Sequence, residues 1–176
     1  MIRGEFYYIN TTMIRKVQKT DAARLAEIYN YYISNTTITF ETEEIDAQEM
    51  GNRISSLSAT GPYFVYEEDG IIKGYCYAHP WKVRKAYANT YEVTIYLDNK
   101  FKGEGLGKKM VTRLIEECKS FGLHALIACI TAENSESCIF HEKLGFNKVS
   151  HFKEVGWKFN RWIDVCDYEL ILSEVK

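Results

Sequence analysis

The chain has 176 residues, of which 46% are hydrophobic and 26% are charged, and its formal net charge is −2. This length and composition are typical of one globular domain with its own core, and not of a disordered chain. The small negative charge argues against a nucleic-acid or membrane-surface partner, and the apolar runs are too short to cross a membrane.

The first half of the chain predicts a short appendage, a strand, two helices and a hairpin. We assign residues 1–12 to an N-terminal extension and residues 13–172 to a single domain. Thr20 and Asp21 are suitable N-caps for the first helix, and Gly61-Pro62 ends the second. The expected elements are a strand over 13–17, helices over 22–33 and 46–58, and paired strands over 63–67 and 71–78.

The second half predicts a strand, a glycine-rich turn and a helix, followed by more strands and a short helix. The helix after the turn carries Leu106, Met110, Leu114 and Cys118 on one face. The other expected elements are strands over 91–97 and 125–130, a helix over 135–144 and strands near 147–155 and 163–172. The order βααβββαβαββ indicates an α+β fold around a mixed sheet.

The segment from Tyr91 to Met110 carries the strongest functional signal. Gly103, Gly105 and Gly107 stand between a strand and the start of a helix, where backbone N–H groups lack partners and the helix dipole is positive. Such a turn is a seat for a phosphate or pyrophosphate. An ordinary flexible turn is one alternative. A Rossmann site is another, but the third glycine of G-x-G-x-x-G is missing.

No cluster of histidines and cysteines has the spacing of metal ligands, so we expect no metal. We expect free, buried thiols at Cys76, Cys118, Cys129, Cys138 and Cys166. The first residues lack the apolar core of a signal peptide, which favours the cytoplasm.

Several motifs together resemble the GCN5-related N-acetyltransferase (GNAT) superfamily. They are Lys102-x-x-Gly105-x-Gly107 after a strand, then Asn134, then His141-Glu142-Lys143-Leu144-Gly145-Phe146. The segments Trp81–Tyr87 and Gly156–Val165 further resemble the phosphinothricin and methionine sulfoximine N-acetyltransferase subgroup. The chain departs from these patterns at Lys102, where Arg or Gln is usual, and at Asn160, where Gly is usual. Asn tolerates a left-handed turn, so we expect the hairpin there to survive.

The resemblance implies a GNAT fold with a mixed, mostly antiparallel sheet flanked by helices, and acetyl-CoA as donor. It implies that the pantetheine arm pairs with the backbone of Ile95, Tyr96 and Leu97, with Asn134 and Ser137 on the facing side. The pyrophosphate is expected on the amides of Lys102, Gly103, Glu104, Gly105, Leu106, Gly107 and Lys108.

Glu92 is the candidate general base, because acetyl transfer needs a neutral amine and amines are mostly protonated at pH 7. Strand alternation separates Glu92, Thr94 and Tyr96 from the core-facing Tyr91, Val93, Ile95 and Leu97. Partial burial there would raise the pKa of the carboxyl. Glu92 could act directly or through a water molecule. A simple exposed or ion-paired strand residue is the alternative.

His141 occupies the position where the superfamily commonly has a Tyr that protonates the departing thiolate. The imidazole could protonate sulfur or help to take the amine proton, and a solvent-facing or capping histidine is the alternative. For the acceptor we expect Lys82 and Arg84 to bind an anionic group, with Tyr87, Phe40 and Thr94 near the pocket. A solvated basic loop is the alternative for the cations.

These features predict an N-acetyltransferase that acts on the α-amine of a small amino-acid-like acceptor of the phosphinothricin, methionine sulfoximine or methionine sulfone type. A protein or peptide acetyltransferase and a non-catalytic acyl-CoA-binding domain are the alternatives. The resemblance also implies a homodimer with the Trp157–Trp162 hairpin near the partner. Neither a nucleic acid nor a membrane is expected as partner.

Overall fold

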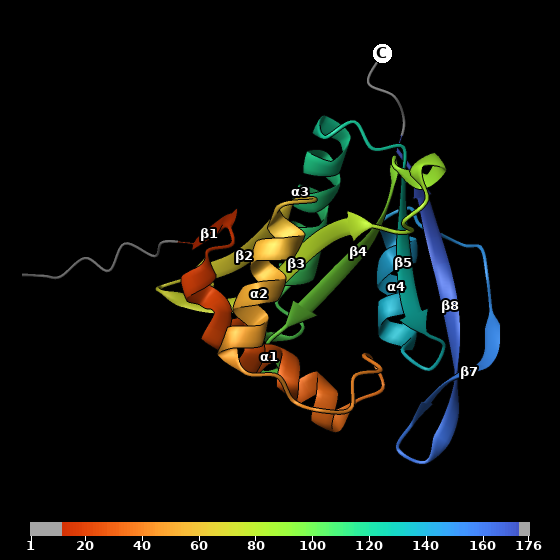
Figure 1. The fold of residues 1–176 in the computed structure, drawn as a ribbon, viewed down its shortest axis with the longest axis horizontal. Helices are drawn as coiled ribbons and strands as arrows, with labels where there is room; N and C mark the ends of the chain where they lie inside the picture. The colour runs from red at the N-terminus through yellow and green to blue at the C-terminus, as the bar shows by residue number, and fades with distance from the viewer. Residues whose placement is uncertain (1–11, 173–176) are drawn as a thin grey trace, which may run out of the picture.

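A computed structural model describes residues 12–172 of the chain (Figure 1). The helices are α1 (Ala22–Asn35), α2 (Ala47–Ser58), α3 (Leu106–Ser120) and α4 (Ser135–Lys143). The strands are β1 (Thr12–Lys16), β2 (Tyr63–Glu68), β3 (Ile71–Pro80), β4 (Thr90–Leu97), β5 (Ala125–Thr131), β6 (Asn147–Lys148), β7 (Phe152–Lys158) and β8 (Arg161–Ile171). Residues 1–11 of the predicted extension lie outside the described part, and Thr12 already belongs to β1.

One sheet runs in the order β1-β2-β3-β4-β5-β8-β6, and β7 also pairs with β8. All its pairs are antiparallel except β4 with β5, which run parallel. The predicted α+β class and mixed, mostly antiparallel sheet are therefore confirmed.

The two faces of the sheet carry separate hydrophobic clusters. Helices α1 and α2 cover one face over β2 to β4, where Leu25 and Ile54 pack with Tyr75. Helix α3 covers the other face, where Met110 and Leu114 are fully buried. The alternating pattern of the strands explains this division, because successive side chains point to opposite faces.

The single strand predicted near 147–155 is wrong, because the structure has two strands there, β6 and β7. The amides of Val149 and Ser150 both donate to the carbonyl of Asp167, which takes the chain out of register with β8. Glu154 then adopts a positive φ of 54°, and β7 pairs with β8 again beyond an irregularity. A bulge of this kind ends one ladder and begins another.

The hairpin between β7 and β8 turns at Phe159 and Asn160, whose φ angles are 51° and 57°. Two consecutive positive φ angles are those of the type I′ turn that fits the twist of paired strands. Asn is among the residues that accept this conformation most readily, so the prediction that the hairpin survives at Asn160 is confirmed.

Three of the five cysteines, Cys76, Cys118 and Cys166, are buried free thiols as predicted. The prediction is wrong for Cys138, which is half-buried, and for Cys129, which is exposed. Cys129 lies on β5, whose continuous apolar run from Ala125 to Ile130 is typical of a strand covered on both faces. Helices α1 and α2 do not extend over β5, so one face of that strand stays open.

Candidate active site

The parallel strands β4 and β5 separate shortly after they meet. They pair only at Thr90 with Ala125, Tyr91 with Leu126 and Glu92 with Ile127. Farther along, β4 and β5 line opposite sides of one cavity, in which residues 92–96 face residues 128–131. The separation leaves backbone groups on the facing edges of β4 and β5 that a ligand can use for hydrogen bonds.

The glycine-rich turn and the first turn of α3 form a second cavity of about 560 Å³. Gly103 and Gly105 have φ angles of 86° and 76°, which a residue with a Cβ adopts only with strain. Gly105 is the N-cap of α3, so the first amides of the helix face outward without partners in the helix. Asp98 fixes the start of the turn, because its carboxylate accepts from the amide of Lys100 and from Arg24.

Most residues predicted to bind the donor line this larger cavity. Lining it are Ile95, Leu97, Lys102, Gly103, Gly105, Gly107, Lys108, Asn134 and Ser137. Tyr96 lines the smaller cavity instead. The side chains of Glu104 and Leu106 line neither, since Glu104 lies 3.6 Å from the Lys73 ammonium and Leu106 is buried in the core.

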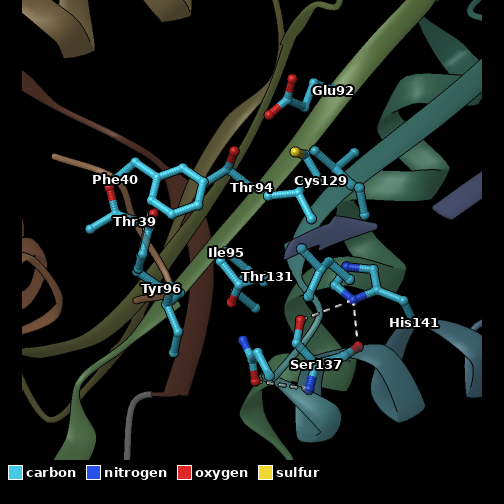
Figure 2. A pocket seen from close by; sticks show the side chains of 16 residues that line it. Thr39, Phe40, Glu92, Thr94, Ile95, Tyr96, Cys129, Thr131, Ser137 and His141 are labelled. Atoms are coloured by element: carbon cyan, nitrogen blue, oxygen red, sulfur yellow. Dashed lines mark hydrogen bonds between the residues drawn. The ribbon is translucent and has the colours of Figure 1, made fainter. Parts of the chain in front are cut away.

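The smaller cavity, of about 230 Å³, joins the two predicted catalytic residues (Figure 2). Glu92 lies at one end on β4, and His141 approaches from α4. The two cavities share Ile38, Ile95, Asn134 and Ser137 in their walls, so they adjoin at these four residues. A long donor molecule and a small acceptor can therefore meet where the cavities join.

Burial is the main cause of the raised pKa of Glu92. His79, its partner across the β3–β4 ladder, lowers the pKa, whereas the negative charge of Asp167 raises it. The net shift toward neutrality is the direction predicted for this strand residue. It suits a carboxylate that accepts a proton from an amine.

His141 is only 4% exposed, and burial lowers its pKa. Its Nδ1 lies 2.8 Å from the carbonyl oxygen of Ser137 and 3.3 Å from the Ser137 hydroxyl. Because a carbonyl can only accept, Nδ1 carries the proton and Nε2 of the neutral ring carries a lone pair. The Asn134 side chain caps α4 by accepting from the Ser137 amide, which holds this turn of the helix in place.

The outer wall of the smaller cavity comes from the loop between α1 and α2, which carries Phe40. The Phe40 ring packs on β7 at Gly156, where even a Cβ would come within 2.2 Å of the ring. The buried ammonium of Lys158 donates to the carbonyl of Thr39 at 2.8 Å. These contacts make the β7–β8 hairpin the support of the loop.

The loop is also tied to the start of α4. The carboxylate of Glu133, just before Asn134, accepts from the hydroxyl of Thr37 and from both terminal nitrogens of Arg161, the latter at 2.7 Å. Phe40 from this loop and Thr94 from β4 line the smaller cavity, whereas Tyr87 lines neither cavity. Their part in binding an acceptor stays a prediction.

The predicted cationic residues, Lys82 and Arg84, line neither of the two cavities. Lys82 and Arg84 are exposed, and the Lys82 ammonium lies 3.7 Å from the centroid of the Trp81 ring and 5.2 Å from that of Tyr87. Their loop begins one residue after Pro80, which pairs with Tyr91. It therefore lies near the Glu92 end of the site, outside the cavity.

Sequence reasoning missed several lining residues, among them Tyr32, Ile38, Thr39, Cys129, Thr131, Glu136, Phe140 and Lys143. Alternation along β5 carries the signal for two of them. Ala128 and Ile130 belong to the core, so Cys129 and Thr131 must face the other side of the sheet.

Within residues 12–172, no group of three His, Cys, Asp or Glu side chains could hold a metal ion. The absence of a metal stays a prediction. Across the same range, none of the helices combines the length and apolar character that a membrane crossing needs.

Comparison with known proteins gives a consistent result. The acetyltransferase (GNAT) domain family matches residues 14–166. The L-amino acid N-acyltransferase of Escherichia coli is 34% identical over 92% of this chain and 94% of its own length. The phosphinothricin N-acetyltransferase of Streptomyces viridochromogenes is 34% identical over 89% of this chain and 88% of its own.

A solved structure is similar to this chain at the level of the fold as well. It is the phosphinothricin acetyltransferase of Sinorhizobium meliloti in complex with acetyl-CoA. It superposes with a TM-score of 0.88 at 31% identity, over 92% of this chain and 89% of that one.

Proposed function

The chain belongs to the GNAT acetyltransferase family, and we propose that it transfers the acetyl group of acetyl-CoA to the α-amine of a small, amino-acid-like acceptor. The observation that carries this proposal is the pair of adjoining cavities, one ending at the glycine-rich turn and the other at Glu92. Relatives named as acyltransferases of L-amino acids and phosphinothricin support the acceptor class.

The larger cavity fits the coenzyme in charge and shape. Gly103 and Gly105 leave open space where a Cβ would project, and the amides that open α3 suit a pyrophosphate. Lys102 and Lys108 add positive charge. The bound donor supplies a thioester, whose carbonyl carbon the amine attacks.

Glu92 takes the first proton, which converts the ammonium of the acceptor into a nucleophilic amine. Its raised pKa brings the carboxylate nearer to the pKa of the group it deprotonates. When the N–C bond forms, the nitrogen still carries one proton too many. When the C–S bond breaks, sulfur needs one.

His141 can serve both needs in sequence. In the neutral ring fixed by Ser137, Nε2 has no proton to give and can only accept one. Nε2 takes the second amine proton and then gives it to the sulfur that leaves. The acceptor becomes an amide, the coenzyme leaves as a thiol, and Glu92 returns its proton to solvent.

The acceptor lies between Glu92 and Phe40, with Thr94 on the same face of β4. Arg84 and Lys82 act from the loop at the Glu92 end, where they attract the anionic group of the acceptor. The rings of Trp81 and Tyr87 hold the Lys82 ammonium at this end of the site.

The functional form is a cytoplasmic homodimer. Several large apolar side chains of the β7–β8 hairpin are exposed, including Trp157 at 52% and Trp162 at 57%, whose rings pack at 4.9 Å. Exposed apolar groups gathered on one hairpin are typical of an interaction surface. The free thiols suit a reducing compartment.

The proposal is tested by incubating the purified chain with acetyl-CoA and a panel of acceptors, and measuring release of the CoA thiol. The panel contains the common amino acids, phosphinothricin, methionine sulfoximine, methionine sulfone and a basic peptide. We expect release with one or more small acceptors and not with the peptide. A chain that binds acetyl-CoA but acetylates only the peptide would contradict the acceptor class.

A further inference from the structure

Thr131 carries a polar group that the protein itself does not satisfy. Throughout residues 12–172, its Oγ1 is the one buried side-chain nitrogen or oxygen without a hydrogen-bond partner. The residue is 5% exposed and lines the smaller cavity. Buried hydroxyls are nearly always paired, because leaving one unpaired destabilises the fold. A hydroxyl kept in this state indicates that a ligand supplies the missing partner.

The position of Thr131 on β5 indicates which ligand that is. Cys129 and Thr131 share the face of β5 that looks into the cavity, and Cys129 lies nearer to the β5 residue that pairs with Glu92. Thr131 lies farther along, at the turn into α4, where its carbonyl accepts from the amide of Asn134 at 2.9 Å. Asn134 belongs to the walls of both cavities.

Thr131 therefore stands where the cavities join, away from the Glu92 end (Figure 2). If the proposed function holds, the donor enters from the larger cavity and its thioester reaches this junction, whereas the acceptor approaches from Glu92. The acyl oxygen is then the acceptor atom that meets the hydroxyl first.

We propose that the Thr131 hydroxyl donates a hydrogen bond to the carbonyl oxygen of the bound thioester. When the amine forms the N–C bond, the π electrons of the carbonyl move onto this oxygen, and they return when the C–S bond breaks and sulfur leaves with its electron pair. A donor that is already in place stabilises the charge without reorganisation at the moment of reaction. Its lack of a protein partner keeps the proton of the hydroxyl available.

The test compares Thr131→Val and Thr131→Ser with wild type, in the complete chain. Valine keeps the shape and removes the hydroxyl, and serine keeps the hydroxyl. Thr112→Val, an exposed site on α3, is the matched control. Calorimetry measures the affinity for acetyl-CoA and for CoA, which lacks the acyl carbonyl, and steady-state kinetics measures kcat and both KM values.

We expect Thr131→Val to weaken acetyl-CoA binding by about threefold to tenfold and to leave CoA binding unchanged, since only acetyl-CoA offers the oxygen. We expect kcat to fall by about 10- to 100-fold, with the acceptor KM within about twofold of wild type. Thr131→Ser should recover most of both losses. The Tm of the free Thr131→Val protein should not fall, because the variant loses an unpaired buried polar group.

Three results would overturn the assignment. Equal loss of acetyl-CoA and CoA affinity would indicate a packing defect, and a rise in the acceptor KM alone would place the hydroxyl on the acceptor. Unchanged kinetics and affinities would show that the Thr131 hydroxyl contacts neither the donor nor the acceptor. If wild type releases no thiol with any acceptor, the proposed function fails, while the affinity ratio of acetyl-CoA to CoA still tests the Thr131 contact.

Discussion

Replacing Gly156 with alanine should weaken acceptor binding, although its strand, β7, does not line the smaller cavity. The new Cβ would lie 2.2, 2.5 and 2.7 Å from three atoms of the Phe40 ring. Ordinary van der Waals contact begins at 3.4 Å, so the ring must move by about 1.2 Å (3.4 minus 2.2). Phe40 is 39% exposed, which lets the ring swing outward while the domain stays folded.

When a group that positions a substrate is displaced by about 1 Å, the reaction rate can fall by up to roughly 100-fold. We therefore expect kcat/KM for the acceptor to fall by about 10- to 100-fold in Gly156→Ala, with the KM for acetyl-CoA within about twofold of wild type. Thiol release at saturating acetyl-CoA and varied acceptor measures the change. Gly51→Ala is the matched control, because the nearest atom to its Cβ is 3.4 Å away.

A double-mutant cycle shows whether the effect passes through Phe40. If it does, Gly156→Ala adds little to the loss that Phe40→Ala already causes, since residues in contact are not additive. Additive losses, or an unchanged kcat/KM in Gly156→Ala, would refute the role of the strand in placing the ring.

Four further substitutions and one pH profile test the rest of the proposal. Glu92→Gln should lower kcat/KM by roughly 10²- to 10⁴-fold and leave acetyl-CoA affinity unchanged by calorimetry. In wild type, kcat/KM should fall as the pH drops through the raised pKa of Glu92, because the base is then protonated, and a pH profile of Glu92→Gln should lack this limb. Arg84→Ala should raise KM for anionic acceptors and not for neutral amines, in the same thiol assay. Gly105→Val should weaken acetyl-CoA binding about tenfold in calorimetry, since its φ of 76° strains any other residue. If the chain is the homodimer proposed above, Trp162→Lys should shift it toward monomer in sedimentation, and an unchanged mass would remove the hairpin from the interface.

The elements could be predicted from sequence wherever one local rule governs them. The helix of Leu106 to Cys118 follows from its apolar period, and the alternation of residues 91–97 placed Glu92 and Thr94 on the open face of the sheet. Asp46 and Asn134 cap α2 and α4 through bonds to Glu49 and Ser137, as short polar side chains at helix starts commonly do.

What could not be predicted depends on partners far along the chain. The apolar run of β5 is typical of a strand covered on both faces, yet α1 and α2 do not extend over it, so Cys129 and Thr131 line the cavity. The interruption near Val149 depends on a carbonyl of β8. Lys82 and Arg84 were predicted from residue type, and sequence alone did not indicate that their loop lies outside the cavity.

The early separation of β4 and β5 affects how readily the protein without bound coenzyme self-associates or is cleaved by proteases. Three residue pairs form the whole seam between the two halves of the sheet. An extended pantetheine arm in that gap would act as a surrogate strand, whereas an empty gap exposes two strand edges to any stray polypeptide. Bound coenzyme would then protect this chain from self-association and proteolysis, in addition to serving as the acetyl donor.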